Sequence, residues 1–284
     1  MSELADTGIQ TPLPVTVVRP SSGWIRLGLI DIWRFRELLY FLVWRDLKIR
    51  YKQTLVGVLW VILQPVLTMI IFNFVFGRLA GLPSQGVPYP LFVFSGLLPW
   101  QLFASGLSAS SLSIVSSSNV VSKVYFPRLL IPLAAVLGGV VDLLVALVVL
   151  FGLMAYYNFH PGIAFVTLPL FLLLAVAAAF GVGLWLSMLN VKYRDIQYTI
   201  PFLTQIWMFM TPVAYASLLI PPKFRLLYHL NPMATVVDGF RWALLGIKPE
   251  FGAPALGSLS MVVLIIFSGL IYFRRAEKTF ADVI

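Results

Sequence analysis

The chain has 284 residues, of which 60% are hydrophobic and only 11% are charged, and its mean hydropathy is +0.93. This balance excludes an ordinary soluble domain, in which about a quarter of the residues are charged. The net charge is +9, but the bases flank long apolar runs, so membrane topology and anionic lipid explain them better than nucleic acid does. The absence of cysteine excludes disulfides and cysteine-ligated metals.

Six apolar runs predict six transmembrane helices, because about 20 apolar residues span a bilayer core. The expected fold is therefore all-α and polytopic. One transmembrane domain (57–275) follows a cytoplasmic tail (1–34) and an amphipathic interface helix (35–56), and a second cytoplasmic tail (276–284) ends the chain. We expect the spans at 57–77, 90–112, 129–156, 164–189, 198–218 and 254–273.

The segment before the first span predicts a helix in the membrane interface. Tyr40, Trp44, Leu47 and Tyr51 recur at helical spacing on one stripe, and the basic residues project away from it. Those bases can be simple topological anchors, or they can meet a partner protein or the phosphate of an anionic lipid substrate. The candidates for phosphate contact are Arg45, Lys48, Arg50 and Lys52.

Polar residues inside the spans leave two interpretations open. The second and fifth spans carry several Ser, Thr and Gln residues, which usually face protein or a wet cavity rather than lipid. Ordinary helix packing explains many of them, and a pore lined by the first, second and fifth spans is the alternative. Asp142 is the one acid clearly within a span, either a functional residue or a carboxylate satisfied by neighbouring hydroxyls.

Two connections have a distinctive composition. The loop at 113–128 runs from a serine-rich stretch into the basic and aromatic residues Lys123, Tyr125, Phe126 and Arg128, which suit a protein contact. The connection before the last span is long and apolar, and it predicts two short helices in 221–246 that enter the outer half of the membrane or cap a pore. Within it, Asn231 and Pro232 indicate a helix start and Gly246 a helix end. Asp238 and Arg241 can pair at i, i+3.

The distribution of bases predicts the orientation. Of the 20 lysines and arginines, 15 lie on the side of the two termini and 5 on the other side. The positive-inside rule therefore places both termini in the cytoplasm.

Chemistry of its own is not expected of this chain. The sequence contains no G-x-x-x-x-G-K-[S/T] loop for ATP phosphates, no paired carboxylates and no nucleophile–base arrangement. His160 and His229 lack metal-ligand spacing, so we expect no catalytic residues, no metal and no cofactor. If transport is driven, the motor is another polypeptide.

Four segments in order resemble the permease subunit of bacterial ABC-2 polysaccharide exporters, the group that includes O-antigen, capsule and teichoic-acid permeases. They are WRDLKIRYKQTLVGVLWVILQP (44–65), KVYFPRLLIPLAAVL (123–137), NVKYRDI (190–196) and NPMATVVDGFRWALLG (231–246). The resemblance implies a homodimer joined to two copies of a cytoplasmic ATPase in the bacterial inner membrane. It also implies an undecaprenyl-linked glycan, moved outward through a channel between the permeases.

The resemblance assigns roles to particular segments. It places the ATPase-coupling helix within about 113–126 and implies that the interface helix, around 35–52, also approaches the ATPase. It places gate helices at 221–246, which hold Asn231, Pro232, Asp238 and Arg241. Aromatic rings along the channel suit sugar rings. The candidates are Trp60, Phe72, Phe103, Trp207 and Tyr215.

Other functions compete with this interpretation. Within the same class, the substrate can be another lipid, a teichoic acid or a drug. A membrane enzyme acting on lipid-linked sugars would need clustered acids or histidines, whereas the 11 acids here are scattered. An ion-coupled carrier is disfavoured by the lone Asp142 and by the missing internal repeat.

Overall fold

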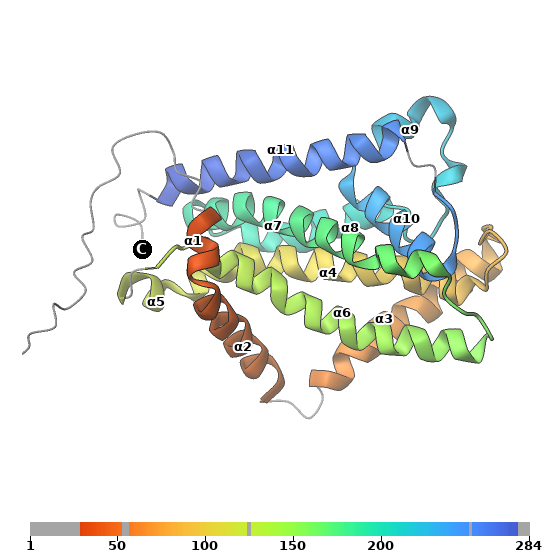
Figure 1. Cartoon of the computed structure of the whole chain (residues 1–284), viewed down its shortest axis with the longest axis horizontal. Coiled ribbons are helices and arrows are strands. Elements are labelled where there is room, and N and C mark those ends of the chain that lie inside the picture. The colour runs from red at the N-terminus through yellow and green to blue at the C-terminus, as the bar shows by residue number, and fades with distance from the viewer. Residues whose placement is uncertain (1–28, 53–56, 124–125, 250–251, 278–284) are drawn as a thin grey trace, which may run out of the picture.

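The computed structural model describes residues 29–52, 57–123, 126–249 and 252–277, and every regular element in these ranges is a helix. The all-α expectation is therefore confirmed. The long helices run side by side in an elongated bundle (Figure 1). In chain order the elements are α1 (Leu29–Arg34), α2 (Arg36–Lys52), α3 (Gly57–Phe72), the π-helix η1 (Asn73–Leu79), α4 (Tyr89–Ser116), α5 (Ser118–Lys123), α6 (Leu130–Tyr156), the 3₁₀ turn η2 (Ile163–Thr167), α7 (Leu168–Lys192), α8 (Ile196–Phe209), the 3₁₀ turn η3 (Ser217–Leu219), α9 (Pro222–Tyr228), α10 (Pro232–Leu245) and α11 (Ala253–Ala276).

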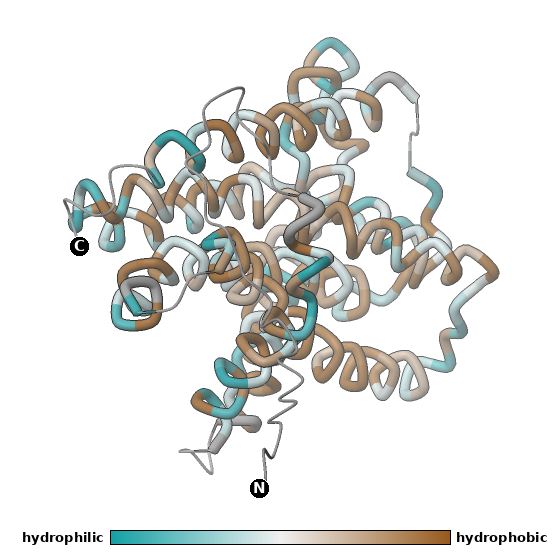
Figure 2. The backbone as a smooth tube through the Cα atoms, turned by 60° about the vertical axis from the view of Figure 1, so that its left-hand side comes forward, coloured by the Kyte–Doolittle hydropathy of each residue, from teal (hydrophilic) through white to brown (hydrophobic). Residues whose placement is uncertain are grey.

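Within the described residues, five helices are long and apolar enough to cross a membrane. They match the first four expected spans and the last one. Hydrophobic residues dominate the lengths of these helices, and hydrophilic ones gather at helix ends and connections (Figure 2). The five are Leu59–Leu79, Tyr89–Ser116, Leu130–Tyr156, Ile163–Lys192 and Pro254–Ala276.

The expected fifth span, 198–218, has a different form. The helix α8 has only 14 residues, and the chain continues through turns to η3. Pro212 explains the early end, because proline has no backbone N–H and disfavours a helical conformation at the preceding residue. The residues after the helix, Thr211 to Ala214, are buried in the protein, which is where non-helical backbone is tolerated at membrane depth. The six-span count stays a prediction.

The bundle has two distinct ends. One, which we call the basic end, carries α1, α2, α5 and the last turn of α11 with Arg274 and Arg275 (Figure 1). The opposite end carries α9, α10 and the connection between η1 and α4. The first and the last of the described helices, α1 and α11, therefore both reach the basic end.

The helix α4 is the centre of the fold. In the most apolar stretch of this helix, 78% of the residues are buried, compared with 11% for the span that begins at Leu59. It packs between α6 and α7 and also contacts α3 and α10. Because α3 lies at the periphery of the bundle, much of its own surface is uncovered within a single chain.

The interface helix is α2 in the structure, and it packs on α6. Its residue Leu42 is buried. The aromatic residues Tyr40 and Trp44 point away from the bundle and are exposed. The helix runs obliquely to the bundle at the basic end (Figure 1). Such a helix, with its aromatic rings outward, fits the boundary between lipid and water.

Candidate functional site

A cavity of about 230 Å³ with a partly polar lining opens between α3, α4 and α6. Gln64 of α3, Gln101 and Ser105 of α4 and Asp142 of α6 supply its polar side chains. The indole of Trp60 lines it as well. Amides, hydroxyls and carboxylates are costly against lipid, so this face of the chain borders water or other protein.

Helical spacing brings these side chains together. Gln101 and Ser105 lie four residues apart on one face of α4, as Trp60 and Gln64 do on α3. Gly139 allows α6 to approach this face of α4 closely. A Cβ at Gly139 would lie 3.1 Å from Leu102 Cδ1 and 3.3 Å from Ser105 Oγ. Small residues at a helix contact permit such an approach in membranes.

Asp142 is held by two residues of the interface helix. Arg50 Nη1 lies 2.5 Å from Asp142 Oδ2, and the Tyr51 hydroxyl donates a hydrogen bond to Asp142 Oδ1. Burial, together with this hydrogen bond, raises the pKa of Tyr51 above its ordinary value, so Tyr51 remains a donor at neutral pH. Among the described residues, the carboxylate is therefore satisfied by Arg50 and Tyr51 of α2, and no hydroxyl of a neighbouring span bonds to it.

A second cavity, of about 250 Å³, lies between α2, α4 and α6. Arg50 lines it, and so does Gly138, the neighbour of the Gly139 that lines the first cavity. Serines of α4 and its end, Ser113 and Ser116 among them, supply hydroxyls. We call the two cavities, with the Arg50–Asp142 pair between them, the polar groove. It follows α4 and α6 from the basic end into the membrane body.

The other bases of the interface helix differ in their surroundings. Arg45 Nη2 lies 2.8 Å from Asp46 Oδ1, and both residues line the second cavity. Lys48 is exposed, and the side chain of Lys52 lies outside the described residues. Arg45 and Arg50 thus each have a carboxylate of this chain beside them, and an anionic headgroup would have to compete with it.

The expected ATPase-facing loop contains the short helix α5, with Lys123 exposed at its end. Tyr125 lies outside the described residues. Phe126 is buried at 6% exposure, so its ring packs inside this chain and is not offered to a partner. Arg128 donates from Nη1 to the Glu277 carbonyl oxygen at 3.2 Å and lies 3.8 Å from the Glu277 carboxylate, which ties this loop to the end of α11.

The helix start predicted at Asn231 and Pro232 is confirmed. The Asn231 side chain accepts a hydrogen bond from Met233 N at 3.1 Å, and Pro232 is the first residue of α10. The Asn231 side chain also contacts α8 and the turn after α8. Trp207 Nε1 donates to Asn231 Oδ1, and Asn231 Nδ2 donates to Thr211 Oγ1. Gly246 closes the helix in the left-handed conformation at φ 69°, also as predicted.

Arg241 supports the non-helical segment that follows α8. Its side chain is 2% exposed and donates to three carbonyl oxygens, of Val213 at 2.7 Å, Tyr215 at 3.2 Å and Phe92 at 3.4 Å. Its guanidinium also lies 3.6 Å from the centre of the Phe92 ring. Burial lowers the pKa of Arg241 to about 10, so the residue stays charged at neutral pH. The bonds to Val213 and Tyr215 replace the helical donors that the carbonyl groups of this segment lack, and the bond to Phe92 ties the guanidinium to α4.

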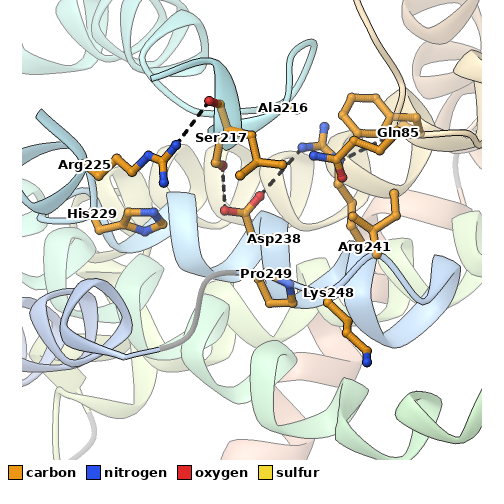
Figure 3. A pocket seen from close by; sticks show the side chains of 12 residues that line it. Gln85, Ala216, Ser217, Arg225, His229, Asp238, Arg241, Lys248 and Pro249 are labelled. Atoms are coloured by element: carbon orange, nitrogen blue, oxygen red, sulfur yellow. Dashed lines mark hydrogen bonds and ion pairs between the residues drawn. The ribbon is translucent and has the colours of Figure 1, made fainter. Parts of the chain in front are cut away.

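The predicted Asp238–Arg241 pair forms, with 3.8 Å between Asp238 Oδ1 and Arg241 Nη1. Ser217 Oγ donates to the other Asp238 oxygen at 2.6 Å, so Asp238 lies between Ser217 and Arg241 (Figure 3). The cavity beside them measures only about 30 Å³. That is the space of about one water, so this cluster is a packed support and not a pocket for a large ligand.

The five aromatic candidates occupy different environments. Trp60 lines the polar groove, whereas Phe103 is fully buried and packs against Trp207 with 4.9 Å between ring centres. Phe72 is half-buried against Phe76. The Tyr215 hydroxyl donates to the Phe209 carbonyl oxygen. In this conformation Trp60 faces open space in the membrane body and Phe103 does not.

Sequence reasoning missed the residues that complete the groove. Gln64 was not singled out, and nothing in the sequence linked Asp142 to Arg50 across 92 positions. The sequence did contain a signal for Gln64, because this amide lies four residues after Trp60 on an otherwise apolar span.

Comparisons with known proteins agree with this architecture. Residues 37–245 match the family model described as ABC-2 type transporter. The chain is 29% identical over 249 residues to the O-antigen export system permease protein RfbA of Klebsiella pneumoniae, which covers 87% of this chain and 95% of that protein. It is also 29% identical to the protein of the same name from Myxococcus xanthus, over 87% of this chain and 96% of that one.

A more distant relative is the polysialic acid transport protein KpsM of Escherichia coli, 23% identical over 82% of this chain and 91% of that protein. The family model covers most of the membrane body, from the interface helix to the end of α10. This multi-pass membrane protein therefore belongs to the ABC-2 type transporter family.

Proposed function

We propose that the chain is the permease subunit of an ATP-driven exporter. Its substrate is an undecaprenyl-linked polysaccharide of O-antigen type, moved from the cytoplasmic to the outer face of the bacterial inner membrane. The observation that carries the proposal is the polar groove, where Gln64, Gln101 and Asp142 face a cavity at membrane depth. A chain that only needed to pack in lipid would not maintain such a lining.

The names of the relatives support a glycan substrate. Two of the similar proteins are called O-antigen export permeases and a third a polysialic acid transport protein. The groove contains two amides, several serine hydroxyls and an indole. These groups can bind sugar hydroxyls and stack on sugar rings.

The exposure of the groove supports a homodimer. Gln64 and Ser105 are exposed in the single chain although they belong to membrane-crossing helices. A second copy, facing the first across a water-filled path, would remove these groups from lipid. The channel then forms between the two copies.

Two copies of a separate cytoplasmic ATPase supply the energy, since ABC-2 permeases work with such a subunit and this sequence has no phosphate-binding loop. We assign the contact to the basic end, where α5 presents Lys123 and where α2 holds Asp142. This arrangement gives the ATPase a short mechanical connection to the groove.

A second substrate class has support as well. The chain is 28% identical, over 67% of its length, to an Escherichia coli protein named inner membrane transport permease YadH, whose name specifies no glycan. A different lipid, a teichoic acid or a drug therefore remains the alternative substrate.

The test is reconstitution in liposomes with the ATPase encoded beside the permease gene. We expect lipid-linked glycan to stimulate ATP hydrolysis and to become accessible on the opposite side of the membrane. The control is an ATPase variant that lacks its phosphate-loop lysine. Stimulation by a lipid or drug but not by any lipid-linked glycan would reject the glycan exporter in favour of the alternative.

A further inference from the structure

Two amide side chains of the first cavity have no hydrogen-bond partner within the described part of the chain. They belong to Gln64 and Gln101, whose neighbours in the lining are Ser105 and Asp142. Each amide offers two donors and one acceptor oxygen. Because lipid offers no partner to these groups, their natural complement is a molecule rich in hydroxyls, or water that such a molecule replaces.

The cavity has the size and one flat wall that a single sugar ring needs. At about 30 Å³ for each water, its volume of about 230 Å³ holds about seven waters. Trp60 is 54% exposed, so part of its indole face is open on this side of the chain. A pyranose ring can place its C–H face on that indole while its hydroxyls reach the amides.

The charge of the lining sets which sugars fit. Among the twelve residues that line the first cavity, Asp142 is the one with a charge. The nearby cation, Arg50, lies on the side of the second cavity, at 2.5 Å from the Asp142 carboxylate. A sugar carboxylate in the first cavity would meet the Asp142 carboxylate with no second cation in the lining. Because Arg50 is already paired with Asp142, an acidic sugar would lose its water without gaining a free cation, and the Asp142 carboxylate would repel it.

We propose that the cavity between α3, α4 and α6 is a binding site for one neutral sugar residue, and that Asp142 makes it select against acidic sugars. This proposal rests on the proposed export function and adds the substrate class. In it, Gln64, Gln101 and Ser105 bind hydroxyls and Trp60 stacks on the ring. Asp142 accepts hydrogen bonds from sugar hydroxyls and repels carboxylates.

The test uses the full chain in lipid nanodiscs and two probes of equal length, a mannose pentamer and a galacturonic acid pentamer. Saturation-transfer NMR and equilibrium dialysis measure their dissociation constants. We expect the neutral pentamer to bind at least about tenfold more tightly than the acidic one, a difference that corresponds to about 1.4 kcal/mol.

Four variants separate the roles of the side chains. Gln64→Leu and Gln101→Leu should each weaken binding of the neutral pentamer about fivefold, the effect of one lost hydrogen bond. The matched control is Gln205→Leu, the same change at an exposed position of α8 outside the cavity lining, which should leave binding within about twofold. Asp142→Asn keeps the shape of the side chain but removes its charge, so the preference for the neutral pentamer over the acidic one should fall.

Each outcome decides the proposal. Gln101→Leu protein that elutes as a single species and binds the neutral pentamer like wild type would overturn it. So would equal or tighter binding of the acidic pentamer by wild type, an unchanged preference in Asp142→Asn, or no binding of either probe. A purely structural role of Asp142 would alter both affinities together and leave their ratio unchanged. The export assay with the partner ATPase reports separately, because glycan export by the Gln101→Leu protein at the wild-type rate would leave the exporter standing without this site.

Discussion

Replacing Arg241 with methionine should release the non-helical segment after α8. Methionine fills a similar length without a charge, so the carbonyl oxygens of Val213, Tyr215 and Phe92 each lose their bond from the guanidinium. Hydrogen bonds to charged groups contribute about 1.5–3 kcal/mol each. The bond at 2.7 Å should contribute most and those at 3.2 and 3.4 Å less. Removing one partner of a buried charged cluster costs about 3–5 kcal/mol, which is the loss we expect.

The assay is thermal unfolding of the purified protein in detergent, followed by intrinsic tryptophan fluorescence. At roughly 2–4 °C for each kcal/mol in a chain of this size, Arg241→Met should lower Tm by about 10 °C. Arg241→Lys keeps the charge but loses the planar fork of donors, so its loss should be intermediate. The matched control is Arg78→Met at an exposed position of η1, where the effect should stay within about 0.5 kcal/mol. A Tm for Arg241→Met within about 2 °C of wild type would refute the assignment of these bonds as the support of the segment.

Three further predictions concern the basic end and the energy source. In a double-mutant cycle, Arg50→Ala and Asp142→Ala should couple by about 1 kcal/mol in unfolding stability, because the pair is partly exposed; strictly additive losses would show that the pair contributes nothing. Phe126→Ala should lower the free energy of unfolding by about 3 kcal/mol, because its ring is buried. Lys123→Ala, at an exposed position, should leave Tm unchanged and weaken co-purification of the ATPase. The reverse pattern would exchange the roles of these two residues. The purified permease should hydrolyse no ATP by itself, and turnover that co-elutes with it and survives removal of contaminating ATPases would contradict this.

Local rules in the sequence predicted the parts of the fold that depend on neighbouring residues. The apolar runs located five of the six expected spans, because crossing a bilayer requires about 20 apolar residues in succession. The side chain of Asn231, the ring of Pro232 and the conformational freedom of Gly246 act within one turn of α10, so its start and end could be predicted.

Features that depend on distant residues could not be predicted in this way. The expected fifth span has an apolar composition up to residue 218, yet it is non-helical after Phe209. Pro212 ends the helix locally, but the sequence did not show that Arg241 satisfies the carbonyl groups of Val213 and Tyr215, which lie 28 and 26 positions before it. The ion pair between Arg50 and Asp142 joins two helices 92 residues apart. A helical repeat relates only residues a few positions apart, so it could not predict this pair. The packing of the helices decides which face of α6 meets α2. The burial of Phe126, expected at a contact surface, has the same origin.

The central claim is that the polar groove is the route of the substrate, and cysteine labelling tests it most directly. The chain has no cysteine, so a single one can be introduced without background. Ser105→Cys places a thiol in the groove, and Val148→Cys places one on the exposed apolar side of α6 as the control. With the partner ATPase in liposomes, a membrane-impermeant thiol reagent should label Ser105→Cys and stop glycan export, lipid-linked glycan should slow that labelling, and Val148→Cys should stay unlabelled and active. Full export by Ser105→Cys after complete labelling, or labelling of Val148→Cys at an equal rate, would contradict the claim.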